Sequence, residues 1–349
     1  MQHRNTRYDL LFRFDAGTSR GIMRQKTSWF LKLEKDNRIG IGEFGILKGL
    51  SVENFDSFEE DINKNIREYS KETKKFNWSS LNDFPVIKFG LEMAHLDLAR
   101  HGNGILFDNA FTRGESSIPI NGLVWMGDYR FMFEQIKEKI DMGFECIKIK
   151  IGAIDFEEEL SLLKYMRSEF AKNDIEIRVD ANGGFKPENA LEKLKLLSDY
   201  HLHSIEQPIR QGQWEEMAKL CLDSPLPIAL DEELIGISNA TLKIKLLDTI
   251  SPHYIIIKPS LLGGYMASEE WIALAKERKI GYWVTSALES NIGLNAIAQW
   301  TYEMDHTMPQ GLGTGLLYHN NFEGPLYIKN GALHFNSKIS VYENFNLFS

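Results

Sequence analysis

From Ile118 onward, short runs of apolar residues alternate with segments of helical periodicity, and this alternation constrains the fold more than any other feature. The apolar runs predict strands at Ile118–Val124, Cys146–Ile151, Ile175–Asp180, Ser204–Glu206, Ile228–Asp231, Tyr254–Lys258, Tyr282–Thr285 and, more weakly, Gln310–Thr314. Helices are expected between them, including Tyr129–Met142, Phe156–Phe170, Pro187–Tyr200 and Ala267–Arg278. Strands that recur about every 25–30 residues are typical of a parallel (β/α)8 barrel. The predicted fold class is therefore α/β with a modified TIM barrel, and a doubly wound open sheet is the alternative.

The N-terminal part of the chain has a different organisation, in which strands come first and helices follow. Aromatic and β-favouring residues predict strands at Tyr8–Phe14, Thr27–Leu33 and Arg38–Phe44, and apolar residues at helical spacing predict helices within Ser51–Lys75 and Pro85–His101. Such segregation indicates a small α+β domain. We expect this domain to span residues 1–115, with residues 116–315 forming the barrel. A strand pair within Phe322–Phe335 is expected to return to the N-terminal domain, so that residues 316–349 complete it.

Composition narrows the functional classes. The 349 residues carry a formal net charge of −9 and contain no polybasic tract, which argues against nucleic-acid and membrane partners. No stretch approaches the ~20 apolar residues of a membrane span, and the first residues lack the apolar core of a secretion signal. Cys146 and Cys221 both lie in apolar stretches and are expected to be reduced, buried thiols. These features predict a cytoplasmic protein, and they leave a homo-oligomer open.

Carboxylates stand at the ends of three consecutive predicted strands. Asp180, Glu206 and Asp231 follow one another at intervals of about one βα unit, so a barrel would place them together at its C-terminal mouth. Neighbouring carboxylates repel unless some protonate or a cation sits among them, and oxygen ligands suit Mg²⁺. Because Glu232 and Glu233 follow Asp231, the third ligand could be shifted by one position. Asp231 is preferred because the apolar run ends there.

Lysines accompany these acids on other strands. Strand alternation puts Lys148 and Lys150 on one face, while Ile149 and its apolar neighbours take the outer face. Lys258 ends the predicted sixth strand, across the mouth. Lysines beside a metal-bound carboxylate suit removal of a proton from the adjacent carbon, since a metal stabilises the resulting enediolate and a neutral amine accepts the proton.

The motifs Lys148-x-Lys150, Asp180-Ala-Asn, Glu206-Gln-Pro, Asp231-Glu and Lys258-Pro, in this order, resemble the enolase superfamily in its muconate lactonizing subgroup. Asp15–Gly21 and Gly42-Glu43 fit the capping domain of that superfamily. No histidine lies between Tyr282 and Glu303, which argues against the mandelate racemase subgroup with its Lys/His pair. Thr285–Leu294 is most similar to the dehydratases that form an aromatic product in menaquinone biosynthesis.

This resemblance implies roles for individual residues. Asp180, Glu206 and Asp231 would bind Mg²⁺, with Mn²⁺ as a substitute. Lys150 would take the α-proton of a small-molecule carboxylate substrate and then protonate the departing hydroxyl, in a syn dehydration. Lys148 would keep the pKa of Lys150 low, and Lys258 would stabilise the enediolate from the opposite face. The implied substrate contacts are Ser286, Asn182, Gly313, Thr314 and Arg20, and Asp15–Arg24 would close over the ligand.

Two alternatives remain at this point. An N-acylamino-acid racemase or dipeptide epimerase would use Lys150 and Lys258 as acid and base on opposite faces of one carbon. Thr285–Leu294 favours the dehydratase. A non-catalytic barrel that only binds a partner is expected to have lost at least one ligand or lysine, whereas all six are present.

Overall fold

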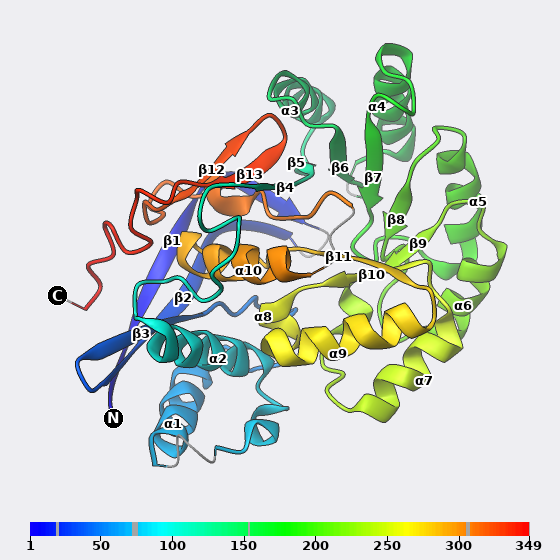
Figure 1. The fold of residues 1–349 in the computed structure, drawn as a ribbon. Coiled ribbons are helices and arrows are strands. Elements are labelled where there is room, and N and C mark those ends of the chain that lie inside the picture. The colour runs from blue at the N-terminus through cyan, green and yellow to red at the C-terminus, as the bar shows by residue number, and fades with distance from the viewer. Residues whose placement is uncertain (19–20, 72–75, 153, 305–307, 349) are drawn as a thin grey trace.

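The computed structural model describes residues 1–18, 21–71, 76–152, 154–304 and 308–348, and the statements below concern these residues (Figure 1). Within them the strands form three sheets, with the orders β1-β2-β3, β11-β10-β9-β8-β7-β6-β5 and β12-β13-β4. The predicted fold class is confirmed, because the large parallel sheet curls into a barrel and an α+β unit covers it (Figure 1).

The N-terminal sheet is antiparallel and consists of β1 (Gln2–Thr18), β2 (Gly21–Lys35) and β3 (Arg38–Phe44). Helix α2 (Pro85–Arg100) packs against β3 so closely that the contact requires glycine, since a Cβ on Gly42 would lie 1.9 Å from the backbone oxygen of Gly90. Helix α1 (Phe58–Lys71) and the 3-10 turn η1 (Trp78–Leu81) complete this unit. The helix predicted within Ser51–Lys75 thus begins later than its pattern indicates. The Asn54 side chain accepts from Asp56 N at 2.8 Å, a local turn that competes with helix.

The barrel strands are short and parallel. They are β5 (Gly122–Val124), β6 (Cys146–Lys150), β7 (Glu176–Asp180), β8 (Ser204–Glu206), β9 (Ile228–Leu230), β10 (Tyr254–Ile257) and β11 (Gly281–Val284). The helices are α3 (Tyr129–Asp141), α4 (Phe156–Glu169), α5 (Pro187–Ser198), α6 (Trp214–Asp223), α7 (Ala240–Ile250), α8 (Pro259–Leu262), α9 (Gly264–Glu277) and α10 (Asn291–Glu303), with the 3-10 turn η2 (Glu232–Leu234) after β9. Ile147, Ile149 and Ile151 are buried in the largest hydrophobic cluster. None of the helices in the described ranges is long and apolar enough to cross a membrane.

The prediction of an eighth strand at Gln310–Thr314 is wrong. Two isolated bridges occur instead, from Gln310 to Ile120 and from Gly311 to Thr285. They join the segment before β5 to the end of β11, so two residues close the ring between its first and last strands. The pairing is short because the Gln310 side chain itself accepts from Val284 N at 2.7 Å and the chain then turns at η3 (Thr314–Leu316).

The run Ile118–Val124 was expected to form one strand and forms two. β4 (Ser117–Pro119) pairs with β13 (Ala332–Phe335), which pairs with β12 (Leu326–Lys329), and β5 alone joins the barrel. The chain changes partners after Pro119, since Ile120 N still donates to Gly331 O at 3.0 Å, whereas Asn121 N donates to Gln310 O at 2.9 Å. The C-terminal strand pair is therefore bonded to β4 and not to the N-terminal sheet.

Aromatic rings connect the C-terminal segment to the N-terminal sheet instead. The ring of Phe322 lies 5.0 Å from that of Tyr8, and the ring of Phe345 lies 5.3 Å from that of Phe30, measured between centroids. Such aromatic pairs add stabilisation beyond the area they bury. Backbone bonds add to these ring contacts, since Arg13 N donates to Leu317 O and His319 N donates to Leu11 O, each at 2.9 Å.

Candidate active site

The ends of β7, β8 and β9 bring three carboxylates together. Asp180 ends β7, Glu206 ends β8 and Asp231 follows β9 directly. Because the parallel register pairs Asp180 with Glu206, both lie at the C-terminal edge of the sheet. One ligand atom from each acid lies within 4.8 Å of the others, and each residue is at most 2% exposed. The convergence expected from the strand-end pattern is therefore present.

Lys148 and Lys150 approach this cluster from β6. The Nζ atom of Lys148 lies 3.0 Å from Asp180 Oδ2 and also donates to Glu206 Oε2. Lys150 donates to the same Asp180 oxygen at 3.1 Å and to Asn182 Oδ1 at 2.7 Å. Both amines thus point to the inner side of the strand, as alternation predicts.

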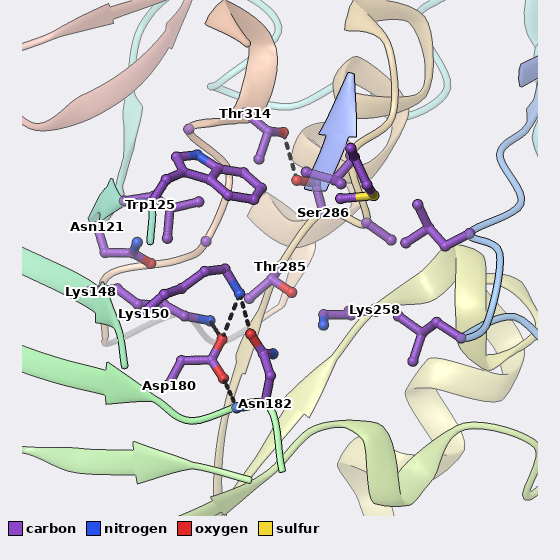
Figure 2. A pocket seen from close by; sticks show the side chains of 18 of the residues that line it. Asn121, Trp125, Lys148, Lys150, Asp180, Asn182, Lys258, Thr285, Ser286 and Thr314 are labelled. Atoms are coloured by element: carbon purple, nitrogen blue, oxygen red, sulfur yellow. Dashed lines mark hydrogen bonds and ion pairs between the residues drawn. The ribbon is translucent and has the colours of Figure 1, made fainter. Parts of the chain in front are cut away.

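Lys258 approaches from the other side. It follows β10 directly, and its Nζ atom donates to Asp231 Oδ2 at 2.5 Å. Figure 2 shows the β6 lysines and Lys258 on opposite sides of the cavity. A molecule in this cavity would therefore meet an amine on either face.

Burial and charge act in opposite directions on these groups. Burial lowers the pKa of Lys148, but Asp180, Glu206 and Asp231 more than reverse this and hold it well above its usual value. Burial also opposes ionisation of Asp180, yet the three lysines hold the pKa of that carboxyl far below its usual range. At Glu206 burial prevails and raises the pKa to about 7, with Asp180 and Asp231 acting in the same direction. Additional positive charge near Glu206 would favour its ionised form.

Two oxygens of the acidic cluster are suited to a cation. Glu206 Oε1 and Asp231 Oδ1 are buried and have no hydrogen-bond partner among the described residues. A buried acceptor without a partner is costly, and hard divalent cations prefer such carboxylate oxygens. The donor set of Asp180, Glu206 and Asp231 therefore fits a divalent metal ion.

The neighbouring polar residues hold these acids in place and distinguish Asp231 from the two glutamates after it. Gln207 Oε1 accepts from Asp231 N at 3.2 Å, and its Nε2 donates to Glu233 Oε2 at 3.0 Å. Asn182 Nδ2 donates to Glu232 Oε1 at 3.1 Å. Both glutamates thus bind protein groups, whereas Asp231 joins the acidic cluster. Asn182 and Gln207 have φ of 43° and 35°, a left-handed backbone that recurs where structure serves a site.

The three amines and Asp180 line a cavity of about 180 Å³ between the barrel mouth and the N-terminal unit. Of the substrate contacts implied by the resemblance, Ser286, Gly313, Thr314 and Asn182 line it, and Ser286 Oγ lies 2.6 Å from Thr314 Oγ1 (Figure 2). Gly21, Ile22 and Met23 of the expected closing segment also line it. Arg20 lies outside the described residues.

Three further polar residues line the cavity that sequence patterns did not indicate. Asn121 Oδ1, Trp125 Nε1 and Thr285 Oγ1 are buried and lack a hydrogen-bond partner within the described part of the chain. The Trp125 ring also lies 5.7 Å from the Lys150 amine. Single polar residues beside a strand carry no periodic signal, so the sequence offers little by which to find them. Unpaired polar atoms that line a cavity are available to a bound molecule.

Comparison with models of protein families shows to which superfamily the chain belongs. Residues 132–339 match the model of the "Enolase C-terminal domain-like" family, and residues 6–98 match that of "MenC, N-terminal domain". The chain therefore belongs to the enolase superfamily. A muconate lactonizing enzyme from Pseudomonas fluorescens has the same fold, with a TM-score of 0.80 at 20% identity over 97% of this chain and 95% of that one.

Relatives identify the branch of the superfamily. An o-succinylbenzoate synthase from Desulfotalea psychrophila is 48% identical, over 94% of this chain and 97% of that protein. The crystal structure of MenC from Desulfotalea psychrophila matches with a TM-score of 0.82 at 45% identity, over 96% of this chain and 99% of that one. Within the superfamily, the chain belongs with the o-succinylbenzoate synthases.

Proposed function

We propose that this protein is a hydro-lyase that converts 2-succinyl-6-hydroxy-2,4-cyclohexadiene-1-carboxylate into 2-succinylbenzoate and water, as a step of menaquinone biosynthesis. The observation that carries the proposal is the cluster of Asp180, Glu206 and Asp231 between amines on two sides, in a chain 48% identical to an o-succinylbenzoate synthase. Its substrate is a small dicarboxylate that fits between the barrel mouth and the N-terminal unit.

The three acids would hold Mg²⁺, for which Mn²⁺ would substitute, through oxygens that include the unpaired Glu206 Oε1 and Asp231 Oδ1. When bound, the ion would draw electron density from the ring carboxylate and make the adjacent C–H more acidic. Asp180 and Glu206 are held for this purpose by Lys148, which contacts both.

Lys150 would act as the general base and then as the general acid. Its neutral amine takes the proton from the carbon that bears the carboxylate, and the C–H electron pair shifts into the ring. The ammonium so formed gives the proton to the hydroxyl leaving the neighbouring carbon, so that one C–O bond breaks and water departs. A single amine serves both transfers because hydrogen and hydroxyl leave from the same face. Asn182 Oδ1, at 2.7 Å, orients the Lys150 amine.

Lys258 would stabilise the negative charge that spreads over the substrate after proton removal, from the face opposite Lys150 (Figure 2). Ser286, Gly313 and Thr314 would contact the succinyl group at the other end of the cavity. We add Asn121 and Thr285 as substrate contacts, because both have an unpaired buried oxygen there when only the described residues are considered. The contact assigned to Arg20 stays a prediction.

The proposal includes the compartment. Cys146 and Cys221 are buried, unpaired thiols in the described part of the chain, as expected for a protein that works in the reducing cytoplasm. The oligomeric state stays a prediction.

The test is turnover of the cyclohexadiene substrate with Mg²⁺, followed by the absorbance change as the ring becomes aromatic. We expect saturable formation of 2-succinylbenzoate. The same preparation is incubated in deuterated water with N-acylamino acids and with dipeptides. Exchange at the α-carbon without any dehydration would support the racemase or epimerase alternative and overturn the proposal.

A further inference from the structure

Two charged residues of the N-terminal sheet are buried against the barrel. Lys26 lies on β2 and Glu43 on β3, and both are almost completely inaccessible. The Lys26 amine lies 3.9 Å from Glu43 Oε1 and 3.4 Å from Ser28 Oγ. Ser28 in turn donates to Glu43 at 2.9 Å. Burial of such groups is costly unless each is paired, so this cluster needs its geometry to be maintained.

Glu43 extends from the sheet to the start of barrel helix α10. Its carboxylate accepts from Ser290 N at 3.0 Å, from Ser290 Oγ at 2.6 Å and from Gly293 N at 2.9 Å. These amides belong to the helix N-terminus, where a negative charge is favourable. The N-terminal unit thus contacts α10 at the end nearest the cavity-lining segment.

The barrel adds a second buried carboxylate to the same cluster. Glu289 Oε2 accepts from Ala287 N at 2.7 Å, and its other oxygen accepts from the Ser260 hydroxyl of α8. Burial raises the pKa of the Glu289 carboxyl, and the nearby Lys26 amine opposes this. The positive charge of Lys26 thus acts on carboxylates from both sides of the interface, Glu43 by an ion pair and Glu289 through its effect on the pKa.

The segment bonded in this way forms one wall of the cavity. Ser286, Ala287 and Leu288 all line it. Leu288 has φ of 65°, a left-handed conformation that costs energy for a branched side chain. Two hydrogen bonds hold Leu288 in this conformation. The Tyr318 hydroxyl donates to Leu288 O at 2.7 Å, and the Glu289 carboxylate accepts from the N–H of Ala287, the residue before Leu288. A strained loop persists only where its surroundings maintain it.

We propose that Lys26, Glu43 and Glu289 are positioning residues that hold Ser286–Leu288 in the shape that receives the succinyl group. The inference rests on the proposed function, because the proposed function places the succinyl group of the substrate against this wall, away from the three acids.

The interface offers a matched control. Glu92 of α2 is also a buried carboxylate of the N-terminal unit, and it accepts from Tyr265 N at 2.7 Å and Met266 N at 3.4 Å at the start of α9. Neither Glu92 nor these two partners is among the described residues that line the cavity. Glu92→Gln therefore perturbs a similar contact without reaching the substrate wall.

The experiment compares Glu289→Gln with Glu92→Gln in the Mg²⁺-loaded protein, by kcat, KM and Tm. We expect both substitutions to lower Tm, but only Glu289→Gln to raise KM for the cyclohexadiene substrate, by about tenfold, because small displacements of a substrate wall weaken binding strongly. The Kd of 2-succinylbenzoate, measured by calorimetry, should rise in parallel. Equal losses of Tm with an unchanged KM and Kd in both variants would overturn the positioning role.

A second pair of substitutions tests the inference if the Glu289→Gln protein folds poorly. Leu288→Gly removes the backbone strain at φ 65°, so the loop no longer needs the buried cluster to hold it in this conformation. Lys26→Met should therefore raise KM less in the Leu288→Gly variant than in the wild-type protein. Additive effects would overturn the inference. If the wild-type protein turns over the substrate and the variants have the same KM as wild type, the inference alone is refuted. If the wild-type protein shows no turnover, the proposed function and the inference are both overturned.

Discussion

At the residue scale, the reaction depends on an amine that reaches its substrate from within a charged cluster. Lys150 shares Asp180 with Lys148 and donates to Asn182, so its position is fixed by two oxygen acceptors. Such positioning matters because a proton is transferred only over hydrogen-bond distances.

Lys150→Ala should therefore reduce kcat by at least about a hundredfold, the usual contribution of a general acid–base group. Substitution of the exposed Lys195 on α5 serves as the control and should leave kcat unchanged. Steady-state kinetics on the cyclohexadiene substrate and thermal unfolding provide the comparison. A Lys150→Ala protein with wild-type turnover would remove the proposed base.

Asn121→Ala should raise KM by about tenfold, the value of one hydrogen bond to a substrate that leaves a partner unsatisfied. The structural reason is that Asn121 lines the cavity and that its buried Oδ1 has no partner in the described chain. Thr285→Val, which removes a second such oxygen and keeps the side-chain shape, should act in the same direction. Unchanged KM in both variants would exclude these residues as contacts.

Sequence patterns indicated the acids and lysines but missed these contacts, for a physical reason. Asp180, Glu206 and Asp231 each end an apolar run, so a periodic fold converts their spacing into proximity. Asn121, Trp125 and Thr285 reach the cavity through details of strand ends that periodicity does not encode. The roles of the predicted site residues stay predictions until tested.

At the element scale, helix α2 begins without a capping side chain of its own, because the residue before it is Phe84. Glu53, more than thirty residues earlier, accepts from Val86 N at 2.6 Å and from Ile87 N at 3.4 Å. Burial raises the pKa of Glu53 to about 7 from its usual 4.5 despite these bonds. The first helix turn therefore depends on a remote carboxyl with an altered pKa.

The pH dependence of stability follows from this shift. Since the folded-state pKa of Glu53 is the higher one, the folded protein retains a proton that the unfolded chain releases between pH 4.5 and about 7. Its contribution to the free energy of unfolding is largest below pH 4.5, falls as the pH rises to about 7 and is constant above that value. Urea unfolding of wild type and Glu53→Gln at pH 5 to 8 should show a difference that declines with pH. A difference that grows with pH would contradict the assignment.

Element boundaries show where sequence patterns were insufficient. The eighth strand was predicted from a weak run, and the chain forms two bridges at Gln310 and Gly311 instead. The Gln310 side chain occupies the position of a strand partner, which no pattern of apolar residues encodes. Ile118–Val124 divides at Pro119, because the two halves bond to different sheets.

At the scale of the whole molecule, the cavity is a property of two units together. The barrel supplies Asp180 and the three amines, and the N-terminal unit supplies Ile22, Met23 and Leu47 to the same cavity. The predicted boundaries of residues 1–115, 116–315 and 316–349 stay a prediction. The barrel could be foreseen because its βα repeat is periodic, whereas the bonding of the C-terminal strands to β4 depends on long-range pairing that local pattern does not specify.

Removal of divalent cations should abolish turnover, and Mg²⁺ should restore it. Because a ligand that binds only the folded state stabilises it, Mg²⁺ should also raise Tm, and the rise should increase with the logarithm of Mg²⁺ concentration above the Kd. Asp231→Asn should reduce this rise, since it weakens one of the three ligands. Full turnover in metal-free buffer, or an equal rise of Tm in the variant, would contradict the ligand set.

The most direct test of the central claim is anomalous diffraction from a crystal grown with Mn²⁺ and 2-succinylbenzoate. We predict one strong anomalous peak from a Mn²⁺ ion that is bound by Asp180, Glu206, Asp231 and the ring carboxylate of the product. Lys150 and Lys258 should lie on opposite faces of the product ring. A peak away from the three acids, or a product whose ring carboxylate lies far from the ion, would contradict the account.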